Sequence, residues 1–570
     1  MKRKEFLKLG MVSGGVLAST PLFSISSFDK TVKNQKERIE GQQMLAADIV
    51  IAGGGLGGCA SALAALRNGL NVILTEETDW LGGQLTQQGV PPDEHRWIET
   101  HGSTQLYRDL RTAIRDYYKC NYPLTASAKA EEFLNPGNSA VSRIAHEPRV
   151  ALAVLYEMLM PYISSKKLTI LLEHKVVDAK VNGDEVTSLT AIDLNTNAKI
   201  ELKAPYFADA TELGDLLPLT GTEFVTGTES KKETRELHAP EQGDPENNQA
   251  WTMCFAVDYL PGEDHTIEKP REYDFWRNFK PDMTPPWSGR ILDFAYSNPR
   301  TLEPKMLGFD PTGAGTPPML NLWNYRRVIN KENFIEGFFD SHVTIINWPQ
   351  NDYVSGNLIG VSDKEFNDQV ERSKQLSLSL LYWLQTEAVR PDGGKGWPGI
   401  RLRKDVLGTD DGMAKYPYVR ESRRIKAVFT ILEEHVGKDN REMVSKKKMG
   451  DAPTDFYDSV GVGSYHIDLH PSSNGNNYLD FSSIRFQIPL GALLPMRMKN
   501  LLPANKNIGT THITNGCYRL HPVEWAIGES VGSLVAYAMK NKVRPFEVRE
   551  KSKVLAEFQE FVRAQGIETH

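Results

Sequence analysis

Three short segments of this 570-residue chain combine histidine, arginine and carboxylate side chains at spacings that suit acid–base chemistry. Histidine is the usual general base near neutral pH, and arginines clamp carboxylates through paired hydrogen bonds. The candidates are Arg519 and His521 in residues 518–525, His466, Asp468 and His470 in residues 464–471, and Arg420 and Arg423 in residues 418–424. We predict His521 as the catalytic base and Arg519 as a contact of a substrate anion or of the cofactor. His466 and Arg420 are the further catalytic candidates.

Each segment also has a structural interpretation. Residues 518–525 would brace a loop. In residues 464–471 the polar side chains alternate, so they would form a hydrogen-bond cluster on one face of an extended segment. Residues 418–424 would be a solvated charged strand. The second group could bind a metal, but no further ligands lie nearby in sequence, so no metal site is predicted. Residues 96–101 and 347–353 join aromatic and polar side chains, a mixture that suits sugar recognition, although a single tryptophan is more often a core residue.

A glycine-rich turn near the start of the chain predicts the element that positions this chemistry. Residues 48–52 are an apolar run suited to a buried parallel strand, and Gly53, Gly55 and Gly58 follow with the spacing G-x-G-x-x-G. A small-residue helix and a second apolar run lead to Glu76. In such a βαβ unit the glycines let the diphosphate approach the helix N-terminus, and the acid binds the ribose hydroxyls. The unit predicts FAD or NAD; the carboxylate would repel the 2′-phosphate of NADP.

Three later segments favour FAD. Gly82 and Gly83 form a second glycine signature, a β-meander over residues 168–208 ends at Asp209 and Thr211, and residues 514–538 hold a glycine loop and a helix with Gly528 and Glu529. From residue 48 to about 543 the chain resembles the FAD-dependent oxidoreductase family that groups with fumarate-reductase-like and glutathione-reductase-type FAD-binding proteins, in particular exported bacterial members of unknown substrate. The resemblance implies that these six residues bind FAD. Glu212 stands where glycine is commoner in that pattern.

We therefore predict an α/β fold, with a discontinuous Rossmann-like FAD-binding domain, a β-meander and an inserted α+β substrate or cap domain. The expected boundaries are 1–28 for a signal peptide, 29–45 for a linker, 46–255 for the first part of the FAD-binding domain, 256–415 for the cap, 416–545 for the returning part and 546–570 for a C-terminal helix. Within the cap, residues 364–389 are expected to form a long helix.

The first 28 residues are typical of an export signal. The chain begins with the basic residues Lys2, Arg3 and Lys4. Residues 9–23 form an apolar segment that is too short to span a membrane as a helix. Residues 3–8 resemble the twin-arginine export motif, with Lys4 in place of the second arginine. We expect a periplasmic or secreted protein with no stable membrane span once the signal is removed.

Composition narrows the functional class. A net charge of −7 gives no basic surface for nucleic acid, and the four cysteines form no C-x-x-C pair for a zinc ribbon or an iron–sulfur cluster. No second G-x-G-x-x-G occurs in a strand–helix context, so no built-in NAD(P)H site is expected. We predict a dehydrogenase that transfers a hydride to FAD from a small organic substrate, either a carbohydrate CH–OH or a carboxylate CH–CH, and passes electrons to an unknown external acceptor. The alternatives are a non-redox carbohydrate-active lyase or binding protein with structural FAD, and a reductase fed by a cytochrome or quinone.

Overall fold

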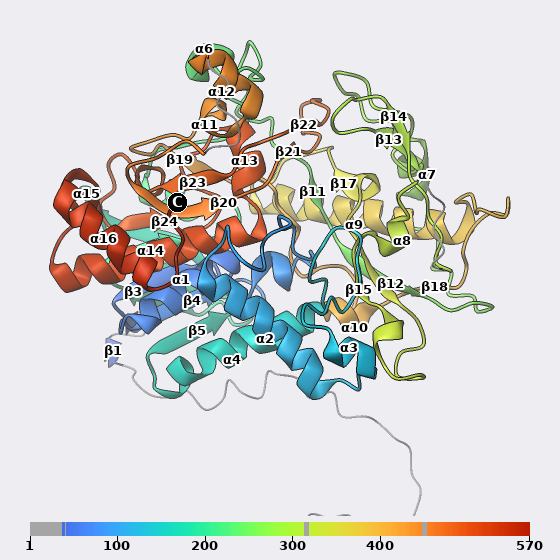
Figure 1. The fold of residues 1–570 in the computed structure, drawn as a ribbon, viewed down its shortest axis with the longest axis horizontal. Helices are drawn as coiled ribbons and strands as arrows, with labels where there is room; N and C mark the ends of the chain where they lie inside the picture. Colours follow the sequence, from blue (N-terminus) through green and yellow to red (C-terminus); the bar gives the residue numbers. More distant parts are fainter. Residues whose placement is uncertain (1–36, 40–41, 313–318, 447–452) are drawn as a thin grey trace, which may run out of the picture.

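The computed structural model describes residues 37–39, 42–312, 319–446 and 453–570. The predicted signal peptide lies outside the described residues. Figure 1 shows that the two ends of the described chain, blue and red, lie together on one side of the molecule, while the middle of the chain, green to yellow, lies on the other. The two sides correspond to a cofactor-binding part and a cap.

A five-stranded parallel sheet forms the centre of the first part. Its strands, in spatial order, are β24 (Leu501–Pro503), β9 (Tyr206–Asp209), β3 (Ile49–Ala52), β4 (Val72–Glu76) and β5 (Leu168–Leu172). The helix α1 (Leu56–Arg67) connects β3 to β4, as the glycine motif predicts. Because β24 pairs with β9 from the opposite end of the chain, this domain is discontinuous, as predicted.

Side-chain alternation along the parallel strands buries both faces of this sheet. Ile49 and Ile51 belong to the large core that contains α1 and α14 (His521–Asn541). Val50 and Ile73 belong to a smaller core shared with the second sheet. The sheet therefore lies between a helical layer and a second sheet, the arrangement expected of buried parallel strands.

The second sheet contains the predicted meander. Its order is β1 (Glu37–Ile39), β2 (Gln42–Ala46), β8 (Lys199–Lys203), β7 (Glu185–Asp193) and β6 (His174–Asn182). Two predictions were wrong in detail. Residues 168–172 form β5 of the parallel sheet, because the chain turns at Glu173, which has φ 55°, before β6 begins. The predicted linker 29–45 already contains β1 and most of β2, which pairs with β8.

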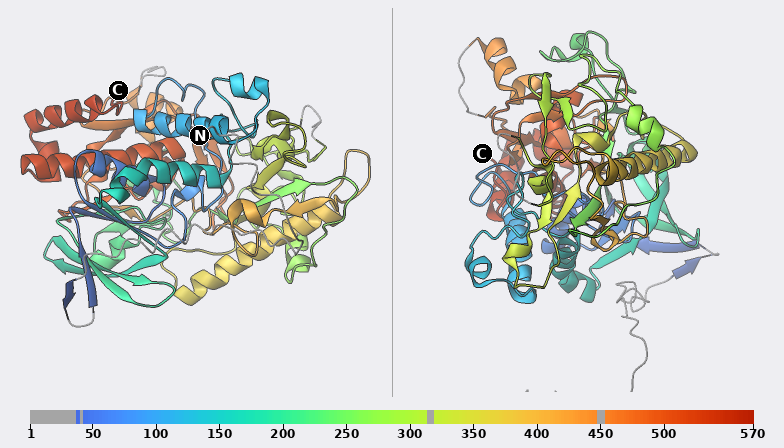
Figure 2. Two further views of the ribbon diagram at one scale, coloured as in Figure 1. Left: turned by 90° about the horizontal axis from the view of Figure 1, so that it is seen from below. Right: turned by 90° about the vertical axis from the view of Figure 1, so that its right-hand side faces the viewer.

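The cap is an α+β unit, as predicted. Its antiparallel sheet runs in the order β15 (Arg327–Ile329), β16 (Val343–Ile346), β12 (Phe255–Tyr259) and β18 (Ile400–Leu402). The long helix α9 (Asp363–Thr386) begins where the Ser362 side chain accepts a hydrogen bond from the Glu365 N–H, and Figure 2 shows it running along one side of the molecule. Two short pairs, β11 (Trp251–Thr252) with β17 (Asp352–Tyr353) and β13 (Ala295–Ser297) with β14 (Pro304–Met306), complete the strands of the cap.

The remaining elements cover these sheets and connect the two parts. They are α2 (Gln105–Asn121), α3 (Ala126–Ala130), α4 (Pro148–Ser164), α5 (Leu216–Thr220), β10 (Phe224–Val225), α6 (Lys231–Thr234), α7 (Tyr273–Asn278), α8 (Leu322–Tyr325), α10 (Lys404–Leu407), β19 (Arg424–Ile425), α11 (Glu433–Val436), α12 (Lys438–Ser445), β20 (Ser459–Gly463), β21 (Ile467–Leu469), β22 (Leu479–Phe481), β23 (Phe486–Pro489), α13 (His512–Tyr518), α15 (Pro545–Glu550) and α16 (Ser552–Ala564), with short 3-10 helices at Gly83–Leu85, Lys331–Asn333, Pro349–Asn351 and Leu490–Leu493. Among the described residues, no helix is both long enough and apolar enough to cross a membrane.

Candidate active site and cofactor cradle

The first glycine turn follows β3 and requires glycine for steric reasons. Gly53 has φ +97°, and a Cβ there would lie 2.2 Å from the Ala210 carbonyl oxygen. A Cβ at Gly58 would lie 2.0 Å from the Gly53 carbonyl oxygen, so Gly58 lets α1 pack against the turn. Gly55 is the N-cap of α1, and the first turn of that helix holds no acidic residue and no capping side chain. The N-terminus of this helix is therefore suited to a phosphate.

Glu76 lies at the end of β4, beside this turn. Its carboxylate accepts hydrogen bonds from the Gly54 N–H at 2.9 Å and from the Thr78 N–H at 2.9 Å. Burial raises the pKa of Glu76 to about 8. The side chain thus holds the glycine turn, and its contact with a ribose stays a prediction.

The second glycine turn lies directly against the first. Gly82 and Gly83 have φ values of +108° and +56°, and a Cβ at Gly83 would lie 2.9 Å from the Leu56 nitrogen. The next residue, Gln84, donates a hydrogen bond to the Arg519 carbonyl oxygen at 3.0 Å. The two turns therefore form one cradle, which is connected to the start of α14.

Asp209 and Thr211 organise the turn after β9. The Asp209 carboxylate accepts from the Thr211 hydroxyl at 2.7 Å and from the Leu216 N–H at 3.1 Å, and burial raises its pKa to about 7. These bonds give both side chains a structural role. Glu212 lies between this turn and the cradle and forms an ion pair with Lys506. Neither Glu212 nor Lys506 was predicted from the sequence as a site residue.

Gly528 and Glu529 lie in the interior of α14, not at its N-terminus. A Cβ at Gly528 would lie 2.0 Å from the Gly57 carbonyl oxygen, so this glycine lets α14 approach α1 closely. The Glu529 carboxylate accepts a hydrogen bond from Trp525 Nε1 at 3.2 Å, and burial raises its pKa to about 7. The structure gives both residues packing roles, and their predicted contacts with FAD stay a prediction.

His521 is fully buried and braces a loop. Its Nδ1 accepts the Asp93 N–H at 3.2 Å, which leaves Nε2 as the donor to the Val90 carbonyl oxygen, also at 3.2 Å. Burial lowers the pKa of His521 to about 4. Because both ring nitrogens are engaged by the backbone, the predicted role as catalytic base is replaced by the structural one.

The pH dependence of stability tests this role. The pKa of His521 falls from 6.5 to about 4 on folding, so its contribution is complete above pH 6.5 and is lost as the pH falls towards 4. That contribution is on the order of 3 kcal/mol at most. Asparagine does not titrate. We therefore expect His521→Asn to take up about one proton fewer on unfolding between pH 4 and pH 6.5, which lowers the slope of the unfolding free energy against pH. Urea unfolding at several pH values measures it; an unchanged slope would contradict the assignment.

Arg519 joins the first predicted segment to the second. Its Nη2 donates to Asp468 Oδ2 at 3.1 Å, and its Nη1 donates to the Tyr418 hydroxyl at 2.8 Å. Burial raises the pKa of Asp468, but His470 and Arg519 outweigh burial and hold this pKa well below its usual range. Arg519 is therefore a buried, paired cation at the start of the helix that borders the cradle.

His470 joins the second segment to the third. Its Nδ1 lies 2.6 Å from Asp352 Oδ2, and the other oxygen of Asp352 lies 3.0 Å from Arg420 Nη2. Burial raises the pKa of Asp352, but Arg420 and His470 outweigh burial and lower it. The Nε2 atom of His470 faces Asp468 Oδ2 at 3.6 Å, and this contact contributes to the low pKa of Asp468. His470 is thus an imidazole held between two carboxylates, Asp352 at Nδ1 and Asp468 at Nε2, and such a group can take up and release a proton.

The predicted arginine clamp does not form. Arg420 contacts Asp352, whereas Arg423 points the other way and pairs with Asp215 at 3.0 Å. Residues three apart in an extended segment lie on opposite faces, which explains the separation. Arg420 remains in the site as the partner of Asp352.

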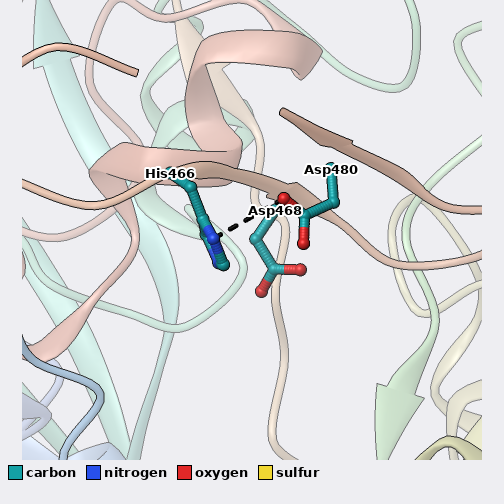
Figure 3. Close-up of side chains that lie close together, drawn as sticks. All are labelled: His466, Asp468 and Asp480. Carbon is teal, nitrogen blue, oxygen red and sulfur yellow. Dashed lines mark ion pairs between the residues drawn. The ribbon is translucent and has the colours of Figure 1, made fainter. Parts of the chain in front are cut away.

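His466 lies near Asp468 and Asp480, as Figure 3 shows. Asp480 faces Asp468 across the β21–β22 pair, and ligand atoms of the three residues lie within 4.8 Å of one another. Such a group could hold a cation. However, Arg300 already donates to Asp480 at 3.2 Å, and Arg519 contacts Asp468, so arginines supply the positive charge here.

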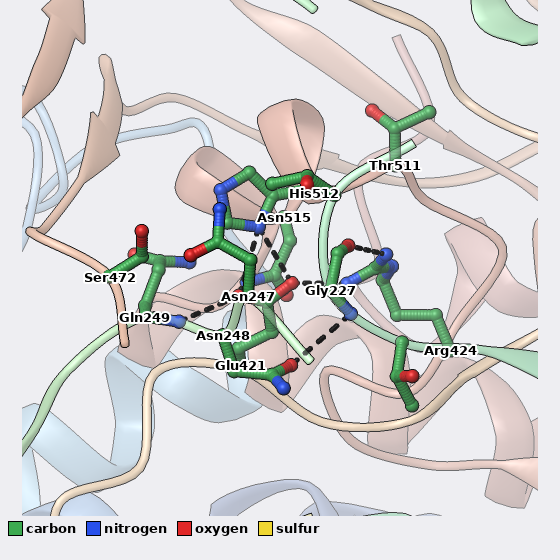
Figure 4. Close-up of polar contacts among 12 residues, drawn as sticks. Gly227, Asn247, Asn248, Gln249, Glu421, Arg424, Ser472, Thr511, His512 and Asn515 are labelled. Atoms are coloured by element: carbon green, nitrogen blue, oxygen red, sulfur yellow. Dashed lines mark hydrogen bonds and ion pairs between the residues drawn. The ribbon is translucent and has the colours of Figure 1, made fainter. Parts of the chain in front are cut away.

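A second carboxylate–histidine pair lies next to this cluster and is shown in Figure 4. His512 Nδ1 lies 2.9 Å from Glu421 Oε1, and Glu421 also pairs with Arg424, which donates to the Gly227 carbonyl oxygen at 2.7 Å. Asn515, on the same helix as His512, donates to the Arg420 carbonyl oxygen at 2.9 Å. This network fixes the backbone of residues 420–424 behind the site.

The cradle and its surroundings fit a dinucleotide. The two glycine turns keep side chains away from the N-terminus of α1, and Lys506 supplies a buried cation. Gln84 Oε1, Glu212 Oε1 and Glu524 Oε1 are buried and have no hydrogen-bond partner within the described chain, as expected of groups that face a bound molecule. Gln84, in the second glycine turn, contacts Arg519, and Arg519 contacts Asp468. The cradle is therefore connected to the cluster of histidines and aspartates.

Comparison with known proteins agrees with this geometry. A family described as FAD dependent oxidoreductase matches residues 48–562. No curated protein matches the chain. Among solved structures, quinol fumarate reductase from E. coli has 11% identity, covers 92% of this chain and 74% of that one, and has a TM-score of 0.33. p-Nitrophenol 4-monooxygenase from Pseudomonas putida DLL-E4 has 12% identity, covers 68% and 70%, and has a TM-score of 0.27.

L-proline dehydrogenase from P. horikoshii has 17% identity, covers 35% of this chain and 26% of that one, and has a TM-score of 0.17, so the chain spans about a quarter of its length. All three TM-scores lie below 0.5, and the assignment depends on the family match and the site. The family match extends from the strand before the first glycine turn to the last helix, and it includes the cradle and the start of α14. The chain therefore belongs to the FAD dependent oxidoreductase family, and the protein is an FAD-dependent oxidoreductase.

Proposed function

We propose that the protein oxidises a CH–OH group of a neutral, polyhydroxylated substrate of the carbohydrate class, with His470 as the general base. The observation that carries this proposal is the Asp352–His470 pair, which lies 2.6 Å apart within a cluster whose arginines are all neutralised. The Asp352 carboxylate orients the imidazole at Nδ1, and Nε2, which faces Asp468 at 3.6 Å, is the atom that we propose accepts the proton.

The balance of charge in the cluster favours a neutral substrate over a carboxylate. Each arginine has its own aspartate: Arg300 with Asp480, Arg326 with Asp93, Arg420 with Asp352 and Arg519 with Asp468, at 3.0 to 3.2 Å. Burial raises the pKa of Tyr418, whereas Arg519, Arg420 and Arg326 lower it. The three arginines therefore lie near this tyrosine, and their ion pairs belong to one cluster. A carboxylate substrate would need an arginine without a partner, whereas hydroxyl groups can bridge carboxylates and guanidinium groups.

Aromatic rings beside the cluster suit the apolar face of a sugar. The Tyr465 ring lies 4.4 Å from the His466 ring, and the Tyr478 ring lies 5.5 Å from the His470 ring and 5.8 Å from the Trp287 ring. The buried Tyr478 hydroxyl has no hydrogen-bond partner within the described chain. Rings that flank polar groups are the combination that predicted sugar recognition for residues 347–353, and Asp352 comes from that segment.

The proposed reaction balances as an alcohol oxidation. When bound, FAD supplies the acceptor for the hydride that leaves the carbon. His470 Nε2 takes the hydroxyl proton as the C=O bond forms, and Asp352 stabilises the resulting imidazolium. Arg519 and Tyr418 are placed to hold neighbouring oxygens. The cycle would close when an external acceptor takes the two electrons, and the two protons, one of them from His470, pass to that acceptor or to water.

Export is part of the same proposal. Residues 1–28 carry the basic start and apolar stretch of a signal, which supports a periplasmic or secreted enzyme. Mass spectrometry of the N-terminus from fractionated cells tests this, because a cytoplasmic protein that retains Met1 to Ser27 would contradict it.

Anaerobic reduction of the bound flavin tests the substrate class. We expect neutral sugars or polyols within a broad panel to bleach the oxidised flavin spectrum, and matched uronic and dicarboxylic acids to be much less effective. Bleaching by dicarboxylates alone would favour the CH–CH alternative. Sugar binding, measured by calorimetry, without any bleaching even with artificial acceptors would favour the non-redox alternative. Either result would overturn the proposal.

A further inference from the structure

We propose that Glu212 is an internal anion that competes with the diphosphate of the cofactor for Lys506, so that loading of FAD exchanges one anion for another. The proposal depends on the assignment of the FAD site and is independent of the substrate. It makes Lys506 a cofactor-binding residue and Glu212 a residue that sets cofactor affinity.

The position of the Glu212 carboxylate is the first observation. Its Oε1 atom lies 3.0 Å from the place a Cβ would take at Gly55 and 3.4 Å from the corresponding place at Gly83. It therefore lies between the two glycine turns, at the N-terminus of α1. Oε1 is buried and has no hydrogen-bond partner within the described chain. A carboxylate in this place has the charge and the surroundings that a phosphate group would have.

The second observation is the fixed position of the lysine. Lys506 is 1% exposed and forms an ion pair with Glu212 Oε2. Its backbone N–H donates to Asn505 Oδ1 at 2.7 Å, and Asn505 Nδ2 donates to the Ala210 carbonyl oxygen at 3.3 Å. The loop that carries the lysine is thus attached to the turn that carries Glu212, and the two charged groups meet at the edge of the cradle.

The charges around the cradle decide the direction of the effect. Burial lowers the pKa of Lys506, but Glu212 and Glu524 outweigh burial and raise it, so the lysine is charged. Burial raises the pKa of Glu524 to about 7; Lys506 opposes this rise and Glu212 adds to it. Lys506 is thus shared between two acids. A bound diphosphate adds two negative charges, and like charges a few ångströms apart at a buried site repel strongly. Removal of the Glu212 charge leaves Lys506 to the phosphates.

Binding of ADP and adenosine to the full chain, freed of FAD, tests the exchange. ADP carries the diphosphate, and adenosine carries the rest of that half of the cofactor. We expect Glu212→Gln to lower the dissociation constant of ADP at least tenfold, to lower that of FAD in the same direction, and to leave adenosine unchanged. Glu223→Gln is the matched control, because Glu223 pairs with Arg497 at the surface. Calorimetry measures the three dissociation constants for each variant without reference to turnover.

Lys506→Met and the double variant complete the cycle. We expect Lys506→Met to weaken ADP binding at least tenfold. If this variant does not fold, because Glu212 is left unpaired, the double variant Glu212→Gln, Lys506→Met removes both charges. We expect the double variant to bind ADP at least tenfold more weakly than Glu212→Gln alone, because only the single variant keeps the lysine for the phosphates. Weaker ADP binding by Glu212→Gln, or equal binding by these two variants, would overturn the proposal. The substrate proposal would stand in either case.

Discussion

His470→Ala is expected to slow flavin reduction by substrate about 10²- to 10⁴-fold, the usual contribution of a general base, while FAD remains bound. The imidazole is held by Asp352 at 2.6 Å from Nδ1, and its Nε2 faces Asp468 at 3.6 Å. Removal of the imidazole leaves the hydroxyl proton without its proposed acceptor. Stopped-flow bleaching of the flavin under anaerobic conditions measures the loss directly, since it does not depend on the external acceptor.

Two further variants separate a base from a structural histidine. Asp352→Asn should also slow the reaction and shift its pH profile, because the amide cannot stabilise an imidazolium as the carboxylate does. The matched control is His265→Ala: His265 Nε2 lies 2.6 Å from Glu263, but this pair is at the surface, so flavin reduction should be unchanged. Loss of FAD or of cooperative unfolding in His470→Ala, with normal flavin reduction in the remaining holoprotein, would contradict the catalytic role.

The sequence was sufficient to predict the cofactor cradle because its signals are local. The conformation of Gly53 and the close packing of Gly58 follow from a strand, a turn and a helix that are contiguous in the chain. The discontinuous sheet, the meander and the α+β cap were predicted in the same way, from runs of apolar residues and turn residues. Gly528 shows the limit of such reasoning. A glycine in a helix interior and a glycine at a phosphate look alike in sequence, and only the approach of α1 at 2.0 Å distinguishes them.

The candidate site was predicted in part because its residues lie in three recognisable segments, while their partners do not. Asp352 belongs to β17 of the cap, and Asp480 faces Asp468 only because β21 pairs with β22. Without these carboxylates, nothing in the sequence distinguishes His470 from His466, or reveals that both nitrogens of His521 are used by the backbone. The three segments meet in the structure, and the residue that we propose as the base is His470 in place of His521.

The same pairs explain why the chemistry needs both parts of the molecule. Asp352 comes from the cap, whereas Arg519 lies two residues before α14, the helix beside the cradle. His470, in the returning segment, lies between them and contacts the cap carboxylate. A displacement of the cap would separate His470 from Asp352, so the proposed reaction would depend on correct docking of the cap.

Gly53→Ala is expected to reduce the free energy of unfolding by roughly 3 kcal/mol or more and to abolish FAD binding. The residue has φ +97°, and its new Cβ would lie 2.2 Å from the Ala210 oxygen, 2.4 Å from the Ala210 carbonyl carbon and 2.6 Å from the Thr211 nitrogen. All three are backbone atoms, so relief requires β3 and the turn after β9 to separate. That movement opens the cradle and displaces Glu212.

Gly69→Ala is the matched control for this change. Gly69 belongs to the same βαβ unit and has φ +90°, but a Cβ there would meet no atom within 4 Å. It should lose only about 1–2 kcal/mol, the cost of a left-handed conformation, and keep its FAD. Urea unfolding and the ratio of flavin to protein absorbance measure the two effects. Equal losses in the two variants would show that backbone conformation alone, and not the approach of Ala210, makes glycine necessary at position 53.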